Sequence, residues 1–203
     1  MKLIKCECCG GNQFQKKAGN SMVCAFCGSV YRMDENENIM SKELTDAKIL
    51  ALYIKAEEFR QNHDPIESLQ KLTEALEVDE GRPLSWVKLG RAYRECGAMN
   101  DSYMDKAVGC YEKAIELDPY FPTAYTNIAT VYLIRKQYAD AVRYFEKGLP
   151  LFDEKDVEYP TVLANYGVAL GLGGDKNEAG RILDKAERLG YENMDQAREI
   201  VGL

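Results

Sequence analysis

The N-terminal cysteines have the spacing of a metal site. Four of the seven cysteines form two copies of one motif, in which two residues separate a cysteine pair and a glycine follows: Cys6, Cys9, Cys24 and Cys27. The two-residue gap lets both thiolates of one turn reach the same metal ion, and the glycine relieves the tight backbone beneath the sulfur atoms. Four thiolates suit a tetrahedral Zn²⁺ ion. Iron is the alternative, because a cage of sulfur ligands accepts both metals.

The residues between the two motifs favour short strands joined by turns. Glycine and asparagine flank Phe14, and Val23 and Val30 precede and follow the second motif, which predicts a small sheet. The pattern resembles zinc ribbons over residues 1–33. A segment of about 30 residues has too small a core to fold alone, so we expect the metal to be required for folding. Cys8 lies inside the first motif and is expected not to bind the metal.

The charge of the chain is unevenly distributed. Residues 1–33 carry five basic residues and one acidic residue, a net charge of +4, although the whole chain has a net charge of −7. The acidic remainder disfavours phosphate binding over most of the surface, so any contact with nucleic acid is expected only at the ribbon. The four thiolates around a zinc ion would themselves add −2 and weaken that contact.

Internal repeats determine the expected fold of the rest of the chain. One unit begins at Pro83, and its large and small residues recur at fixed intervals: Trp86, Leu89, Gly90, Tyr93, Ala107, Tyr111 and Ala114. This unit resembles the 34-residue tetratricopeptide (TPR) consensus, with an insertion after Gly97. We expect surface loops at that insertion, over residues 100–103, and at a second one, over residues 153–156. Small residues in the pattern let two helices approach closely, and large residues fill the space around them.

The repeat register divides the chain into segments. After the ribbon we expect an acidic linker and helix lead-in, then four helical hairpins and a capping helix, at residues 34–48, 49–82, 83–121, 122–159, 160–193 and 194–203 respectively. The resemblance implies a mainly α protein, a right-handed TPR-type α-α superhelix with a small N-terminal β zinc ribbon.

The same resemblance implies a concave groove lined by the first helix of each hairpin, in which many members of the family bind a peptide or helix. The candidate groove residues, taken from the register, are Lys88, Arg91, Arg94, Thr126, Asn127, Thr130 and Asn165. Asn127 and Asn165 fall at equivalent positions of successive units, where two amides would grip an extended peptide backbone. The family's clamp for chaperone C-termini is not expected, because Asn127 alone matches its pattern.

No set of residues in the sequence is typical of catalysis. The one histidine, His63, falls in a predicted turn, and Cys96 and Cys110 fall within predicted helices as small apolar residues. We therefore expect a non-enzymatic adaptor that binds a protein or peptide partner. The alternatives are a nucleic-acid-associated factor that uses the basic ribbon and a metal- or redox-responsive regulator. No stretch is apolar enough for a membrane span and no secretory segment begins the chain, so a cytoplasmic location is expected.

Overall fold

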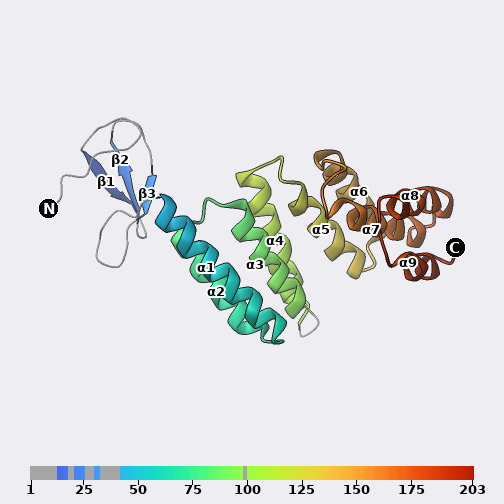
Figure 1. Ribbon diagram of the computed structural model, residues 1–203, viewed down its shortest axis with the longest axis horizontal. Helices are drawn as coiled ribbons and strands as arrows, with labels where there is room; N and C mark the ends of the chain where they lie inside the picture. The colour runs from blue at the N-terminus through green and yellow to red at the C-terminus, as the bar shows by residue number, and fades with distance from the viewer. Residues whose placement is uncertain (1–12, 18–20, 26–29, 33–41, 98–99) are drawn as a thin grey trace. The chain divides into compact units, whose positions relative to one another are not determined.

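The computed structural model describes residues 13–17, 21–25, 30–32, 42–97 and 100–203. The chain divides into two compact units, Met1–Ser85 and Trp86–Leu203. The described residues are mainly helical, as predicted, and Figure 1 shows the helices arranged as successive hairpins. No helix in the described part of the chain combines the length and the apolar character that a membrane span needs.

Three short strands form an antiparallel sheet in the first unit. The order is β1 (Phe14–Lys17), β2 (Ser21–Cys24) and β3 (Val30–Arg32), with β2 in the centre. Phe14 pairs with Cys24, and beyond this pair the Ala25 amide donates to the Gln13 carbonyl at 2.9 Å. The strands predicted from the residues around Phe14, Val23 and Val30 are thus confirmed.

The first hairpin consists of α1 (Lys42–Gln61) and α2 (Pro65–Val78), which lie side by side in Figure 1. Asp64 caps α2, because its carboxylate accepts a hydrogen bond from the Glu67 amide at 3.2 Å. Pro65 follows at the first helical position, where the missing N–H costs no hydrogen bond. His63 is exposed in the turn, as predicted, and has a left-handed φ of 59°.

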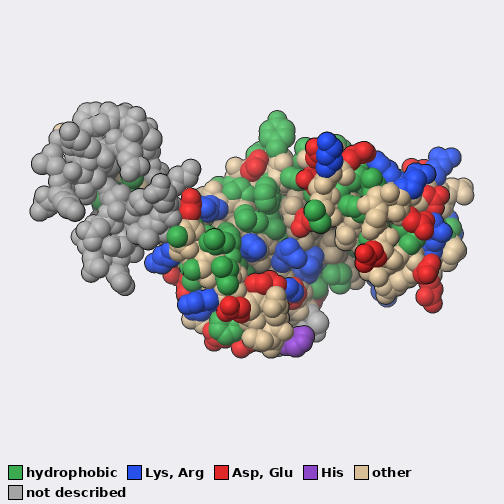
Figure 2. Space-filling view, in the orientation of Figure 1, with side chains coloured by type: hydrophobic (Ala, Val, Ile, Leu, Met, Phe, Trp, Pro, Cys, Tyr) green, Lys and Arg blue, Asp and Glu red, His purple; other side chains and the backbone are tan. Residues whose placement is uncertain are grey.

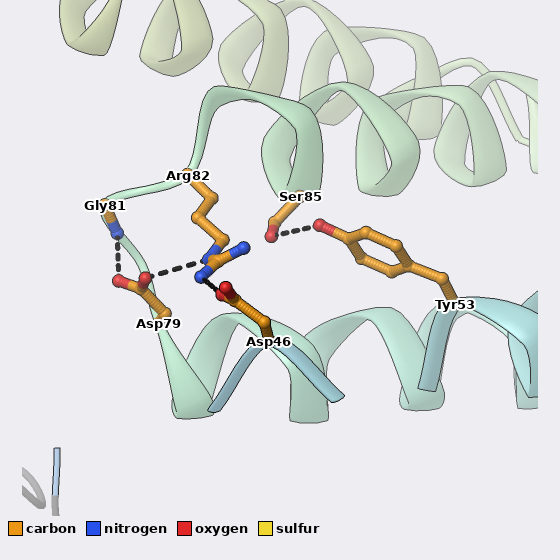
Figure 3. Close-up of polar contacts among 6 residues, drawn as sticks. All are labelled: Asp46, Tyr53, Asp79, Gly81, Arg82 and Ser85. Atoms are coloured by element: carbon orange, nitrogen blue, oxygen red, sulfur yellow. Dashed lines mark hydrogen bonds and ion pairs between the residues drawn. The ribbon is translucent and has the colours of Figure 1, made fainter. Parts of the chain in front are cut away.

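A polar network joins α1 to the connection that leads into α3 (Pro83–Cys96). Figure 3 shows the Arg82 guanidinium between two carboxylates: it donates to Asp79 at 2.9 Å and also forms an ion pair with Asp46. Burial lowers the pKa of Arg82, but its hydrogen bonds to the two carboxylates raise that pKa more. Beside this network, the Tyr53 and Ser85 hydroxyls share a hydrogen bond of 2.6 Å. The network neutralises Arg82 within the first unit.

The second unit continues the helical hairpins after α3. Its further helices are α4 (Ser102–Leu117), α5 (Pro122–Ile134), α6 (Tyr138–Gly148), α7 (Tyr159–Leu172), α8 (Lys176–Arg188) and α9 (Met194–Val201), with a short 3₁₀ helix η1 (Leu149–Leu151) after α6. Helix α5 pairs with α6, and α7 pairs with α8. Helices α4 and α6 also contact the hairpin that follows each of them, and α9 packs on α7 and α8.

Small residues permit the close helix contacts, as predicted. A Cβ atom on Gly90 would lie 2.5 Å from the ring of Tyr111, which is fully buried. A Cβ atom on Gly167 would likewise lie 2.9 Å from the buried Leu183. These glycines therefore set the spacing between the two helices of a hairpin.

The insertion between α3 and α4 differs from its prediction in one respect. The sequence predicted a loop over residues 100–103, but Ser102 and Tyr103 belong to the first turn of α4. The Asn100 side chain accepts a hydrogen bond from the Ser102 amide at 3.0 Å, and the Tyr103 ring stacks on Tyr93 with centroids 6.0 Å apart. The polar residues expected to form a loop therefore extend the helix, because its first turn gains these contacts.

Arg135, in the turn after α5, makes further contacts with the start of α4. Its guanidinium forms ion pairs with Asp101 at 3.2 Å and with Asp105 at 2.8 Å. The second predicted insertion, residues 153–156, is an exposed loop.

Candidate peptide-binding face

The predicted metal ligands fall largely beyond what the structure describes. Cys6, Cys9 and Cys27 lie outside the described residues, and of Cys24 only the backbone, at the end of β2, is described. The hairpin of β1 and β2 brings Gln13, four residues after Cys9, beside the residue that follows Cys24. Such a hairpin is compatible with two cysteine motifs that converge on one ion.

The predicted groove residues lie on three helices of the second unit. Lys88, Arg91 and Arg94 are on α3, Thr126, Asn127 and Thr130 are on α5, and Asn165 is on α7. We call this set of seven residues the A-helix face. Helices α5 and α7 contact each other, and a hydrogen bond described below joins α3 to α5.

A hydrogen bond between two predicted groove residues connects the first pair of these helices. The Arg94 guanidinium donates through Nη1 to Oδ1 of Asn127 at 3.1 Å, and Nδ2 of Asn127 donates to the Thr123 carbonyl at 2.8 Å. Asn127 is only 9% exposed. Both ends of its amide therefore have partners inside the protein, whereas the sequence predicted an amide that contacts a peptide. The register had placed Arg94 and Asn127 in successive units, but it could not show that they touch.

The threonines of α5 also form hydrogen bonds within their own helix. The Thr126 hydroxyl donates to the Thr123 carbonyl at 3.3 Å, and the Thr130 hydroxyl donates to the Thr126 carbonyl at 2.8 Å. Their donors are thus used along the helix. Thr126 is buried, and its methyl carbon would lie 2.9 Å from a Cβ atom on Gly148 of α6, so this predicted groove residue packs inside the hairpin.

Asn165 and Arg91 differ from Asn127. The Asn165 side chain is half-buried and Arg91 is exposed, and neither side chain forms a hydrogen bond or ion pair with the described residues. The polar groups that remain open on the A-helix face are therefore concentrated at Arg91, Arg94 and Asn165.

The two helices α5 and α7, which carry four of the seven residues of the A-helix face, are unusual for this chain in their lack of charge. Helices α5 and α7 contain no charged residue, although 29% of the whole chain is charged. Part of their surface is still open, because Ile134 is 52% exposed and Val168 is half-buried. The open surface of these two helices is thus neutral, a composition more typical of the centre of a protein interface than of a solvated face.

Within the described ranges, the residues with reactive side chains do not form a second site. Cys96 and Cys110 are buried, as predicted, and burial raises the pKa of Cys96 and raises the pKa of Cys110 to about 12. Both thiols therefore stay protonated at neutral pH, and a protonated thiol is a poor nucleophile. Among the described residues, no three His, Cys, Asp or Glu side chains are grouped so that they could hold a metal ion.

A cavity of about 580 Å³ lies between the connection into α7 and the connection into α9. Its lining includes three acidic residues, Glu154, Asp156 and Glu192. Glu154 already forms an ion pair of 2.6 Å with Lys185. Sequence reasoning missed this cavity, because it forms only where two connections far apart in the chain meet.

Comparison with known proteins identifies the repeats. Two tetratricopeptide-repeat family models match residues 84–121 and 110–143. The chain therefore contains tetratricopeptide repeats, and the matched residues cover α4 and α5 and the greater parts of α3 and α6.

Two curated relatives align with part of the chain. One is Hsp70-Hsp90 organizing protein 2 of Arabidopsis thaliana, 30% identical over 91 residues, which are 45% of this chain and 15% of that protein. The other is stress-induced-phosphoprotein 1 of Caenorhabditis elegans, 40% identical over 58 residues, which are 29% of this chain and 18% of that protein. The chain thus spans less than a fifth of either relative.

Two solved structures share the fold. The crystal structure of MamA is 18% identical with a TM-score of 0.55, over 73% of this chain and 83% of that chain. A Thermobaculum terrenum O-GlcNAc transferase mutant is 22% identical with a TM-score of 0.60, over 73% of this chain and 27% of that chain. At these identities the likeness concerns the fold alone.

Proposed function

We propose that the chain is a non-enzymatic adaptor that binds a peptide or helix of a partner protein on its A-helix face. The observation that carries this proposal is the uncharged, partly open surface of α5 and α7 in an otherwise charged protein. Water-facing helix surfaces normally carry charged residues, whereas the centre of an interface is depleted of them.

The relatives give independent support. One is named an organizing protein for Hsp70 and Hsp90, and 91 residues of this chain align with it at 30% identity. The solved transferase shows that the same fold also occurs in an enzyme. For this chain the protonated thiols and the exposed His63 favour an adaptor.

Site-specific photo-crosslinking tests the adaptor function. We would place benzoylphenylalanine at Asn165 of the A-helix face or at the exposed Ile134 of α5 and, as matched controls, at the exposed Glu112 of α4 or Arg181 of α8. We expect a discrete partner protein to crosslink from Ile134 and Asn165 in the native host and not from the two controls. Crosslinks of equal yield from all four positions, or from the controls alone, would contradict the proposal.

We further propose that Cys6, Cys9, Cys24 and Cys27 hold a structural Zn²⁺ ion that stabilises the sheet of β1, β2 and β3. The support is the repeated motif and the hairpin that brings Gln13 beside Ala25. When bound, the ion would supply folding free energy and no open coordination position for chemistry.

Metal analysis of the purified chain tests this site, and Cys8 provides the matched control. We expect one zinc per chain in the wild type and in Cys8→Ser, and a loss of zinc in Cys9→Ser and Cys24→Ser. Iron in place of zinc would select the alternative metal. Equal zinc content in all four proteins would contradict the proposed ligand set.

A further inference from the structure

The cavity beside the start of α7 is formed in part by an insertion that the repeat consensus lacks. The insertion, residues 153–156, lengthens the connection into α7, and the connection between α8 and α9 lines the same cavity. The volume of about 580 Å³ falls within the range of about 300–1,000 Å³ that ligand pockets occupy. None of the lining residues belongs to the A-helix face. The cavity is therefore a candidate binding site separate from that face.

The insertion is held in a fixed shape by its own contacts. Oδ2 of Asp156 accepts a hydrogen bond from the Asp153 amide at 2.9 Å, and Glu154 forms an ion pair of 2.6 Å with Lys185. Lys185 also donates to the hydroxyl of the buried Tyr159 at 3.2 Å. A wall that is already ordered in the free protein loses little conformational freedom when a ligand binds.

Acidic charge is concentrated in the two connections that line this cavity. Residues 153–158 comprise four acidic residues, one lysine and one valine, and Glu192 adds a further carboxylate from the second connection. The neighbouring helices are balanced, since α8 has four basic residues against three acidic ones and α9 has one against two. Figure 2 likewise shows both acidic and basic side chains over α8 and α9. The negative charge is thus a local property of the cavity.

Two of the lining carboxylates are available to a ligand. Oδ1 of Asp156 and the carboxylate of Glu192 make no hydrogen bond or ion pair within the described part of the chain. The one basic residue of the lining is Lys155. No three His, Cys, Asp or Glu side chains in the described ranges are grouped so that they could hold a metal ion. Carboxylates that are spread in this way suit a ligand with several separate positive charges.

Apolar side chains lie next to these carboxylates. Val157 is 94% exposed and Leu189 is 36% exposed, and Pro160 and Tyr191 line the same cavity. Arginine and lysine pack their aliphatic stems on apolar surface while their charged ends bind carboxylates, and both cations are attracted to aromatic rings. The lining therefore combines the two kinds of contact that basic side chains make.

We propose that this cavity is a second protein-binding site, which takes a basic segment of a partner protein. Arginine or lysine side chains pair with Asp156 and Glu192, and their stems cover Val157. Charge complementarity identifies the occupant, because an acidic lining repels nucleic acid and acidic peptides. The site goes beyond the adaptor function proposed for the A-helix face, and neither depends on the other.

Fluorescence anisotropy with end-blocked decapeptides tests the ligand on the full chain. One peptide alternates arginine with alanine, and its control carries citrulline, which has the shape of arginine without the charge. We expect the arginine peptide to bind about tenfold more tightly than the control, and less tightly as salt is raised. Equal binding of the two peptides would overturn the proposal. Tighter binding of spermidine, measured by calorimetry, would do the same, because the ligand would then be a free polyamine.

Charge-matched double variants locate the site. Asp156→Asn/Glu192→Gln should weaken binding of the arginine peptide about tenfold, and the new amide keeps an oxygen for the Asp153 N–H. Glu112→Gln/Glu199→Gln removes the same charge from exposed positions of α4 and α9 and should change binding less than about twofold. Equal losses would show that the net charge of the chain governs binding and would overturn the site. Thermal melting checks that each variant is folded.

A substitution at Val157 separates docking from general electrostatic attraction. Val157→Ser leaves the charge unchanged and should weaken binding about threefold with the same salt dependence, because an apolar contact is lost. Tyr120→Ser, at a side chain 79% exposed in the connection between α4 and α5, is the matched control and should have no effect. Unchanged binding of the arginine peptide to Val157→Ser would mean that no segment docks in the cavity.

Discussion

Arg82 lies just before helix α3 and Arg94 lies near its end, yet the surroundings of the two arginines differ. Arg82 bonds to two carboxylates, Asp46 and Asp79, which neutralise it. Arg94 bonds to one neutral amide, that of Asn127. An arginine enclosed by carboxylates thus stabilises the architecture, whereas an arginine ordered by a neutral group keeps a charge that a partner can use.

Other arginines in the second unit follow the first pattern. Arg135 binds Asp101 and Asp105, and Arg198 binds Asp184 and Glu187. Arg94 therefore departs from the way this unit pairs its ordered arginines, which makes the comparison testable by substitution.

The largest expected effect on stability comes from Gly90→Ala, which would displace α3. Gly90→Ala would place a methyl group 2.5 Å from the Tyr111 ring, and we expect a loss of about 1–3 kcal/mol of unfolding free energy from overpacking. A shifted α3 would also disturb the bond between Arg94 and Asn127, while the bonds of Arg82 lie in the first unit. Urea unfolding followed by circular dichroism measures the loss.

Gly109→Ala is the matched control for Gly90→Ala. Gly109 lies in α4 with nothing within 4 Å of its added Cβ, so alanine there should stabilise the protein by about 0.5–1 kcal/mol through its helix propensity. Similar losses in both variants would show that the close contact at Gly90 is not the cause.

Alkaline titration tests the burial of Cys110 on α4, which lies in the same hairpin as the half-exposed Arg94. Burial raises the pKa of Cys110 from 9.0 to about 12, so the folded thiol keeps its proton where the unfolded thiol has lost it. The contribution of the protonated Cys110 thiol to the unfolding free energy is complete below pH 9.0. It decreases as the pH rises towards about 12, by at most about 1.4 kcal/mol per pH unit.

Cys110→Ala should therefore lose stability less steeply than the wild type between these pH values. Unfolding free energies measured at several alkaline pH values give the two slopes, and the other titrating groups cancel in the difference. Identical slopes would mean that the thiol is not closed to water.

Arg82 and Arg94 can be compared directly by replacing each of them with glutamine. Arg82→Gln leaves Asp46 and Asp79 to repel each other and should cost about 0.5–1 kcal/mol, since these side chains are partly exposed. Arg94→Gln breaks no ion pair, but the shorter side chain does not reach Asn127, and the lost hydrogen bond should cost about 0.5–1.5 kcal/mol. That loss should not change with salt concentration, whereas the loss from Arg82→Gln should decrease as salt is raised. An equal salt dependence in both variants would remove the distinction.

The smallest expected effect is at Arg135. Arg135→Gln removes two ion pairs whose carboxylates are 79% and 72% exposed, and solvent screening limits the loss to about 0.3–0.5 kcal/mol. Raising the salt concentration should reduce the difference from the wild type further. A loss larger than that of Arg82→Gln would show that exposure does not govern these pairs.

Particular residues show which parts of the fold and of the candidate site could be predicted from the sequence alone. The interval between Gly90 and Tyr111 predicted a close helix pair, because a repeat pattern specifies which small residue faces which large one. Ser102 and Tyr103 were wrongly predicted as loop, because the stacking of Tyr103 on Tyr93 is a contact between two helices that no local propensity encodes. The A-helix face was predicted residue by residue, but which of its amides are free was not.

Helical hairpins with tetratricopeptide spacing could be predicted from the amino-acid sequence, because periodicity and small-residue positions are local properties of the chain. That the seven residues of the A-helix face share one surface stays a prediction. The packing of the helices, which the sequence does not reveal, bonds Asn127 at both ends, leaves Asn165 open and leaves Arg94 with an uncompensated charge. A hydrogen bond between side chains 33 residues apart forms only if the two helices that carry them are positioned with a precision of a few tenths of an ångström.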